Sequence, residues 1–326
     1  MDHPIHQANE NSPFGDLTRE EFYRKNHVLH HESFMLNSRN MKIFTQSWRP
    51  DSTAPLKGLV AMVHGYISDS SWILQLTAVA IAKAGFYVCA LDLQGHGYSE
   101  GIPGHIPDIQ LVIHDCIQFF DSARSNYPKL PAFLYGESLG GAIAILICIK
   151  QEGKWSGLVL NGAMCGVSAK FKPAWALEKL LPVVAYLAPT WRVVITKPLA
   201  SKSFKEEWKR KLVARNPNRR SYGKPPAATA LEFLKVCEVI RKKCQELELP
   251  MLVVHGEDDS VCDSESARLV YKLVASKDKT LNIFPGMWHQ LIGEPKESVE
   301  LVFGTILSWL GDRADKVLIN TNRLFI

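Results

Sequence analysis

The residues Gly136-Glu137-Ser138-Leu139-Gly140 give the strongest indication of the fold of this chain. A short apolar run precedes it at 131–135, and a longer one follows at 139–149. This order predicts a strand, a sharp turn and a helix with a serine at the turn, the layout called a nucleophile elbow. Small flanking residues let neighbouring segments approach the serine. The helix begins beside its hydroxyl, so free backbone N–H groups at the helix start can bind an oxyanion.

The rest of the sequence alternates between short apolar runs and helical segments. The predicted strands are 32–37, 41–48, 58–63, 86–91, 132–135, 157–160, 251–254 and 280–284. The predicted helices between them are 70–84, 108–127, 139–151, 264–275 and 297–310. Near-continuous apolar strands that alternate with helices indicate a mostly parallel sheet covered by helices on both faces. The sequence therefore predicts an α/β fold.

The alternation stops near Gly162 and resumes at Met251. We therefore expect a core formed by residues 31–164 and 246–312, with residues 165–245 inserted into it as a helical lid. Residues 1–30 are predicted to be a polar N-terminal lead-in, and residues 313–326 a short C-terminal tail.

The net charge of +5 is unevenly distributed. Residues 165–245 contain 18 lysines and arginines against 5 acidic residues, so the predicted lid carries +13 and the rest of the chain −8. Such a basic segment suits an anionic lipid surface or a substrate with a carboxylate or phosphate. A solvated helical face is the simpler alternative. No nucleic-acid-binding motif accompanies the charge, so we expect no nucleic acid partner.

Composition and sequence pattern argue against several other classes of protein. Hydrophobic residues make up 46% and charged residues 22%, as in ordinary globular proteins. The polar start of the chain lacks the pattern of a signal peptide, and the apolar runs are too short to span a membrane. The seven cysteines show no C-x-x-C spacing, and no acidic residue or cysteine completes a metal site with the cluster His27, His30 and His31. We expect a cytoplasmic protein without metal or cofactor, with peripheral membrane association as an alternative.

Two later segments complete a candidate catalytic site with Ser138. Three acidic residues follow the strand predicted at 251–254, and His289 follows the strand predicted at 280–284. The chain order serine, acid, histidine at strand ends is typical of Ser-His-Asp hydrolases of this sheet type. Glu257, Asp258 and Asp259 are all candidates for the acid. Asp259 is best placed beyond its strand, and Asp258 is the alternative.

The oxyanion hole is expected to combine two backbone N–H groups. One belongs to Leu139, directly after the serine, and the other to Tyr66 in the loop after the first parallel strand. His64 precedes this loop and is interpreted as a structural residue that shapes the turn at Gly65. Cys262, three residues beyond Asp259, is expected near the site.

On these motifs the chain resembles the monoacylglycerol lipases, especially the plant branch that includes caffeoylshikimate esterases and lysophospholipase-type enzymes. The stretches that carry the resemblance are Phe44–Trp48, His64–Tyr66, Asp92–Ser99, Gly136–Gly140, His255–Asp259 and Asp278–Leu281. The resemblance implies an α/β-hydrolase fold, a Ser138, Asp259 and His289 triad, and oxyanion donors at Tyr66 and Leu139. Glu137 before the serine matches the plant branch, whereas the animal enzymes have histidine there.

The expected activity is hydrolysis of monoacylglycerols or related lysolipids without a cofactor. Hydrolysis of hydroxycinnamoyl esters such as caffeoyl shikimate is the alternative within the enzyme class, and a ligand receptor on a hydrolase fold is the alternative outside it. The lid stretch 174–189 is rich in large apolar residues. It is expected to guide an acyl chain, to contact a membrane, or to pack on the core.

Overall fold

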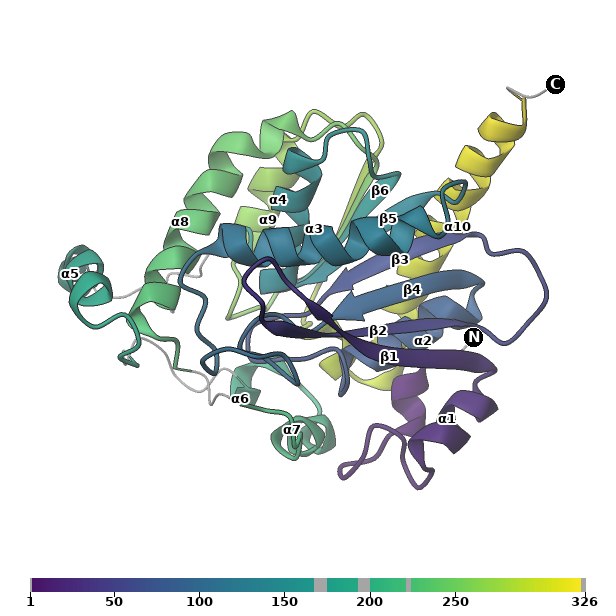
Figure 1. Cartoon of the computed structure of the whole chain (residues 1–326), viewed down its shortest axis with the longest axis horizontal. Coiled ribbons are helices and arrows are strands. Elements are labelled where there is room, and N and C mark those ends of the chain that lie inside the picture. The colour runs from purple at the N-terminus through teal and green to yellow at the C-terminus, as the bar shows by residue number, and fades with distance from the viewer. Residues whose placement is uncertain (1, 167–174, 193–199, 221–223, 324–326) are drawn as a thin grey trace.

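The computed structural model describes residues 2–166, 175–192, 200–220 and 224–323. Within them, eight strands form one sheet in the order β1-β2-β4-β3-β5-β6-β7-β8 (Figure 1). The strands are β1 (Val28–Leu36), β2 (Lys42–Pro50), β3 (Gly58–Val63), β4 (Phe86–Leu91), β5 (Ala132–Glu137), β6 (Gly157–Asn161), β7 (Met251–Gly256) and β8 (Lys279–Phe284). The pairs β1–β2 and β2–β4 are antiparallel, and all other pairs are parallel. This confirms the predicted mostly parallel α/β sheet.

The first hairpin is longer than the sequence predicted. β1 and β2 pair from Leu36 opposite Lys42 to Val28 opposite Pro50, whereas the prediction had 32–37 and 41–48. Polar side chains along β1 weakened the strand signal, since this edge strand is exposed on much of both faces.

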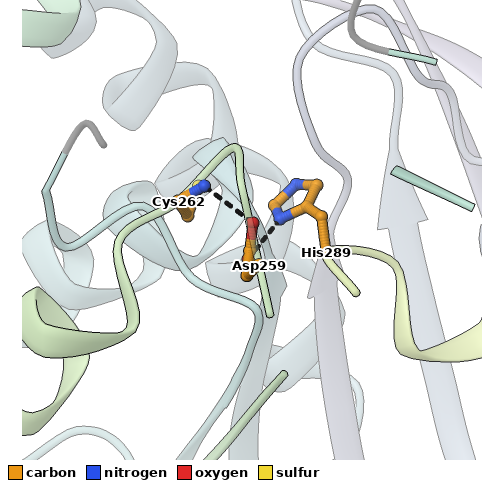
Figure 2. Close-up of side chains that lie close together, drawn as sticks. All are labelled: Asp259, Cys262 and His289. Carbon is orange, nitrogen blue, oxygen red and sulfur yellow. Dashed lines mark hydrogen bonds and ion pairs between the residues drawn. The ribbon is translucent and has the colours of Figure 1, made fainter. Parts of the chain in front are cut away.

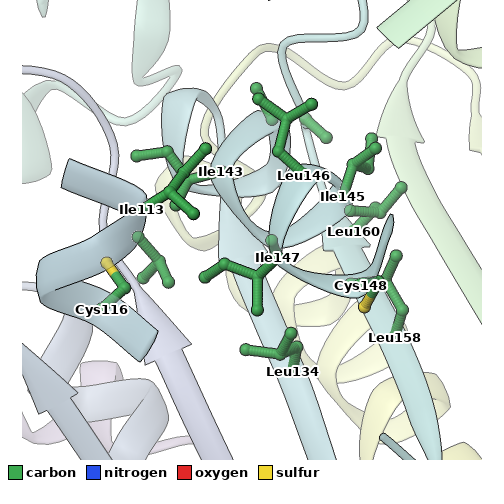
Figure 3. Packing of buried hydrophobic residues seen from close by; sticks show 14 of the residues in the cluster. Ile113, Cys116, Leu134, Ile143, Ile145, Leu146, Ile147, Cys148, Leu158 and Leu160 are labelled. Carbon is green, nitrogen blue, oxygen red and sulfur yellow. The ribbon is translucent and has the colours of Figure 1, made fainter. Parts of the chain in front are cut away.

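Two layers of helices cover the sheet. The described helices of eight or more residues are α2 (Leu74–Lys83), α3 (Ile109–Ser125), α4 (Leu139–Lys150), α5 (Trp175–Leu187), α7 (Glu207–Ala214), α8 (Ala227–Lys243), α9 (Ser264–Leu273) and α10 (Lys296–Arg323). Helices α3, α4 and α9 contribute to the hydrophobic core on one face, and α2 and α10 to that on the other. Figure 3 shows side chains of α3 and α4, such as Cys116 and Ile147, gathered over Leu134 of β5.

Helix α10 was predicted too short. The sequence indicated an end near Leu310 and a tail from residue 313, but the helix continues to Arg323 (Figure 1). Ala314 is fully buried in the core, and the guanidinium of Arg313 lies 2.6 Å from Asp278 and stacks over Trp309. Arg313 and Ala314 therefore hold the turn beyond Leu310 against the body.

A helical region is inserted between β6 and β7, as expected. It contains α5, the short helix α6 (Ala200–Ser203), α7 and α8. Leu181 of α5 packs against Ala227 and Ala230 of α8, whereas Leu212 of α7 joins the core beside α2 and α10. Among the described helices, none is long and apolar enough to cross a membrane.

Candidate active site

Ser138 lies at the sharp turn between β5 and α4. Its φ of +52° is a left-handed backbone conformation that non-glycine residues rarely adopt. The neighbouring glycines permit this turn: a Cβ on Gly136 would lie 2.3 Å from the Gly140 carbonyl oxygen, and one on Gly140 would lie 2.1 Å from the Val63 oxygen. The GESLG stretch therefore forms a strained turn that presents the serine.

The structure brings the predicted serine, histidine and acid together. The Ser138 hydroxyl lies 3.0 Å from His289 Nε2. His289 Nδ1 lies 2.7 Å from Asp259 Oδ2, and Figure 2 shows this contact. Glu257 and Asp258 are exposed, whereas Asp259 is buried. Of the three acidic residues left open by the sequence, Asp259 is therefore the one that contacts His289.

Asp259 accepts hydrogen bonds on both carboxylate oxygens. Oδ1 accepts the backbone N–H groups of Val261 and Cys262 at 2.7 and 2.9 Å, and Oδ2 lies 3.1 Å from His255 Nε2 as well as near His289. Burial acts to raise the pKa of Asp259. The charge of His289 and the hydrogen bonds from His255 and His289 outweigh burial, so this pKa lies well below its usual value. The carboxylate is therefore held ionised.

The sequence analysis did not identify His255 as part of this site. It lies within β7, in a stretch where every residue is buried. The available signal was a polar residue at the end of an otherwise apolar strand, four residues before the acid.

Tyr66 and Leu139, the expected oxyanion donors, both line the cavity at Ser138. Leu139 is the first residue of α4, and the first N–H groups of a helix have no partner within it. The loop carrying Tyr66 passes close to the serine, because a Cβ on Gly65 would lie 3.2 Å from Ser138 Cβ. The Tyr66 hydroxyl donates to the Gly104 carbonyl at 2.8 Å, which fixes the ring.

His64 supports the same loop and does not contact the triad. Its Nε2 accepts the Leu93 N–H at 2.9 Å, so its Nδ1 carries the proton and donates to the Gly65 carbonyl at 2.7 Å. Burial lowers the pKa of His64 to about 4, despite the opposing effect of that hydrogen bond. The neutral ring therefore shapes the turn at Gly65, as the sequence indicated.

A cavity of about 180 Å³ opens onto Ser138 and His289 between the core and the inserted region. Most of the side chains that form its walls are apolar. They include Ile73, Met164, Leu181, Phe204, Val213, Phe233, Leu234 and Val261. Asn216 and Arg219, both from the inserted region, and Gln290 add polar groups. The cavity therefore suits an apolar ligand with a polar group at one side.

Several cations of the inserted region hold it to the core. They donate to backbone carbonyl groups outside the insertion: Arg192 to Pro103, Lys205 to Gly286, Lys209 to Ile292 and Glu294, and Arg220 to Ser99 and Gly101. Lys209 is also buried, so it belongs to no surface patch. The sequence analysis expected this basic charge to face an anionic lipid surface, an anionic substrate or solvent. Several of the lysines and arginines instead hold the inserted region to the core, which the sequence did not indicate.

Asn216 makes a further contact between the inserted region and the core. Its amide donates to Asp69 Oδ2 at 2.6 Å, and Asp69 lies beside Asp92 in the interior. Burial and the neighbouring Asp92 raise the pKa of Asp69 to about 7. Burial raises that of Asp92 to about 6. Both carboxyl groups therefore keep their protons to a higher pH than an ordinary aspartate does.

Asp259, Cys262 and His289 present potential metal ligands within 4.8 Å of one another (Figure 2). The arrangement fits a catalytic triad better than a metal site, because the Nδ1–H group of His289 donates a hydrogen bond to Asp259. Burial and the charge of Asp259 raise the pKa of the Cys262 thiol well above its usual value, so the thiolate that metals prefer is disfavoured. The Cys262 sulfur lies 3.9 Å from Ser138 Oγ, which confirms its expected position near the site.

Comparisons with protein families, with individual proteins and with solved structures each find relatives of this chain. A family model described as serine aminopeptidase, S33, matches residues 54–296. The chain is 34% identical to caffeoylshikimate esterase of Arabidopsis thaliana, over 93% of this chain and 92% of the relative. It is 29% identical to monoglyceride lipase of Homo sapiens, over 86% and 90%. A crystal structure of a soluble variant of monoglyceride lipase from Saccharomyces cerevisiae superposes with a TM-score of 0.76 at 19% identity, over 86% and 94%.

Proposed function

The chain belongs to the α/β-hydrolase family of monoacylglycerol lipases and caffeoylshikimate esterases and is a serine ester hydrolase, and we propose that it releases fatty acids from monoacylglycerols or related lysolipids. The observation that carries the proposal is the apolar cavity that opens directly onto Ser138 and His289. An acyl chain fits such walls, because burying each methylene group is favourable by about 0.8 kcal/mol.

The proposed reaction is a two-step acyl transfer. His289 takes the proton of Ser138 across their 3.0 Å contact as the hydroxyl oxygen attacks the ester carbonyl. Asp259 holds the imidazole in the required tautomer and stabilises its charged form. The N–H groups of Tyr66 and Leu139 stabilise the oxyanion, each by about 2.7–4 kcal/mol. His289 then protonates the leaving glycerol oxygen, and a water molecule activated by His289 releases the fatty acid.

Residues 165–245 are proposed to act as the lid that selects the substrate. Leu181, Phe204, Val213, Phe233 and Leu234 contribute walls of the cavity from this segment. Ser138, Asp259 and His289 lie outside it. The lid therefore decides which acyl group reaches a reaction centre that belongs to the core.

A direct test compares kcat/KM for a long-chain monoacylglycerol and for caffeoyl shikimate on one preparation, with Ser138→Ala as the blank. The proposal requires a preference for the monoacylglycerol of at least about tenfold, a free-energy difference of about 1.4 kcal/mol. A preference for the shikimate ester of the same size would overturn it.

Arg219 favours hydroxycinnamoyl ester hydrolysis as the second candidate. Its side chain lines the cavity, where a guanidinium would suit the carboxylate of caffeoyl shikimate. The relative that is 34% identical is a caffeoylshikimate esterase. Under this alternative, Arg219→Met raises KM for the shikimate ester and leaves KM for its methyl ester nearly unchanged. Equal effects on both esters would refute a carboxylate contact.

Peripheral membrane contact is proposed for the outer face of α5 and the residues after it. Tyr186, Leu187 and Trp191 are 85%, 74% and 70% exposed, and Leu180 and Val183 lie on the same helix with more than half of their surface exposed. These side chains are large and apolar, and a segment rich in lysine and arginine follows them in the sequence. Adsorption to anionic vesicles is the expected behaviour.

A further inference from the structure

His255 stands directly behind the acid of the site. Its side chain is fully buried at the end of β7, and its Nε2 lies 3.1 Å from Asp259 Oδ2. That oxygen is the one that accepts His289 Nδ1 at 2.7 Å. Two imidazole rings therefore share one carboxylate oxygen, one of them facing Ser138 and the other facing the interior.

The surroundings of His255 determine its tautomer. Nε2 faces two acceptors, the Asp259 carboxylate and the Cys262 carbonyl oxygen at 3.3 Å, so this nitrogen carries the proton. Nδ1 is buried and has no hydrogen-bond partner among the described residues. A second proton on Nδ1 would be buried without an acceptor, which is costly. The ring therefore acts as a neutral donor to Asp259.

We propose that His255 is a positioning residue for ester hydrolysis: its Nε2–H holds the Asp259 carboxylate and shares its negative charge, which sets the orientation and basicity of His289. This role rests on the proposed catalytic function of Ser138, Asp259 and His289, and it is independent of the proposed substrate. The backbone N–H groups of Val261 and Cys262 bind only Oδ1, so His255 and His289 divide the other oxygen between them.

Other ionisable groups face this acid and its histidine from neighbouring elements. The Cys262 thiol lies in the loop after β7, and burial keeps it neutral by raising its pKa. Glu137 at the end of β5 interacts with the charge of His289, and burial raises the pKa of this carboxyl. Glu137 accepts a hydrogen bond from Tyr135 at 2.7 Å. Cys262, Glu137 and Tyr135 are unchanged in a His255 variant. A difference in pH dependence between this variant and the wild type is therefore attributed to His255.

The direction in which loss of the His255 donor changes the pH dependence of kcat/KM can be predicted. Without it, the negative charge of Asp259 falls more strongly on His289 and stabilises the protonated imidazole. The acidic limb of the kcat/KM–pH profile therefore moves to higher pH. The value of kcat/KM at neutral pH falls by about 10- to 100-fold, as expected for the loss of one hydrogen bond to a charged group in a reaction centre.

The experiment compares His255→Leu, which removes the donor, with His255→Gln, whose side-chain amide can still donate to Asp259. The substrate is p-nitrophenyl butyrate, a generic soluble ester. Rates are divided by the concentration of active sites, titrated with a fluorophosphonate, and kcat/KM is measured from pH 5 to pH 9. Ser138→Ala is assayed in parallel.

The proposal expects His255→Leu to move the acidic limb of the kcat/KM–pH profile to higher pH and to lower kcat/KM at neutral pH. His255→Gln should reverse most of both changes. A purely structural histidine would lower the fraction of titratable sites and leave the rate per site and the profile unchanged, which would overturn the proposal. If His255→Leu does not fold, His255→Asn replaces it, because its shorter amide does not reach Oδ2. Activity retained by Ser138→Ala would instead refute the catalytic site itself.

Discussion

The Ser138 hydroxyl lies 3.0 Å from His289 Nε2, although 151 positions separate the two residues in the chain. The contact exists because β5 and β8 belong to the parallel part of one sheet, where the carboxyl ends of the strands lie at the same edge. The helical insertion between β6 and β7 lengthens the sequence between the two residues without moving them apart.

Ser138→Ala should abolish ester hydrolysis while the protein remains folded. Removing the nucleophile of a comparable triad costs about 10⁶-fold in kcat. The measurement is kcat/KM for p-nitrophenyl butyrate together with a thermal melt. A variant that keeps more than a tenth of the wild-type rate would refute the assignment of the nucleophile.

Asp259→Asn should lower kcat by about 10⁴-fold, because an amide favours the wrong tautomer of His289. Asp258→Asn is the matched control, since Asp258 is the exposed neighbour. It should keep kcat within about twofold of wild type. A reversed outcome, with Asp258→Asn the inactive variant, would transfer the role to Asp258.

Asp69→Asn should stabilise the protein more at pH 8 than at pH 5. Burial and the neighbouring Asp92 raise the pKa of Asp69 to about 7, so the folded state binds a proton that the unfolded state has lost. Stability therefore falls as pH rises from about 4 to about 7, and the substitution removes this loss. Each kcal/mol relieved should raise Tm by about 1.5 °C in a chain of this length. Equal changes in Tm at both pH values would contradict the titration of Asp69.

Leu187→Ser combined with Tyr186→Ser should weaken adsorption to anionic vesicles without lowering kcat/KM for p-nitrophenyl butyrate. Both side chains are exposed on α5, so the loss should concern membrane contact and not packing. Leu301→Ser is the control, because Leu301 is 57% exposed on α10. Flotation with phosphatidylserine-containing vesicles gives the measurement. Equal adsorption of both variants would exclude α5 as the membrane contact.

Arg220→Met should loosen the inserted region. The guanidinium donates to the Ser99 and Gly101 carbonyls, and each hydrogen bond of this kind contributes about 1 kcal/mol. Chymotrypsin should therefore cleave within 165–245 faster than in the wild type. Arg241→Met, at an exposed position on α8, should leave the rate of cleavage unchanged.

The sheet and the three residues of the candidate triad could be predicted because their signals are local. Buried strands read as apolar runs, and Ser138, Asp259 and His289 each follow one of them. The end of α10 could not be predicted, since it depends on the contact between Arg313 and Asp278, far apart in sequence. The hydrogen bonds of Lys209 and Arg220 to backbone carbonyls of the core could not be predicted either. A lysine or arginine that donates to a distant carbonyl has the same sequence pattern as one that faces solvent.

The sequence analysis did not predict that His255 contacts the candidate triad. The sequence analysis placed it directly after the strand predicted at 251–254, whereas the structure has it buried within β7. Its function depends on the direction of one ring nitrogen toward Asp259, which follows from the turn after the strand and not from the pattern within it.

The separation of the inserted region from the reacting groups has a consequence for how such enzymes diversify. In the lid role proposed for residues 165–245, substitutions in this segment would change which ester is admitted while Ser138, Asp259 and His289 stay in place. New specificities can therefore arise by drift in a single segment, provided that the cations which fasten it to Ser99, Pro103 and Ile292 are inherited with it.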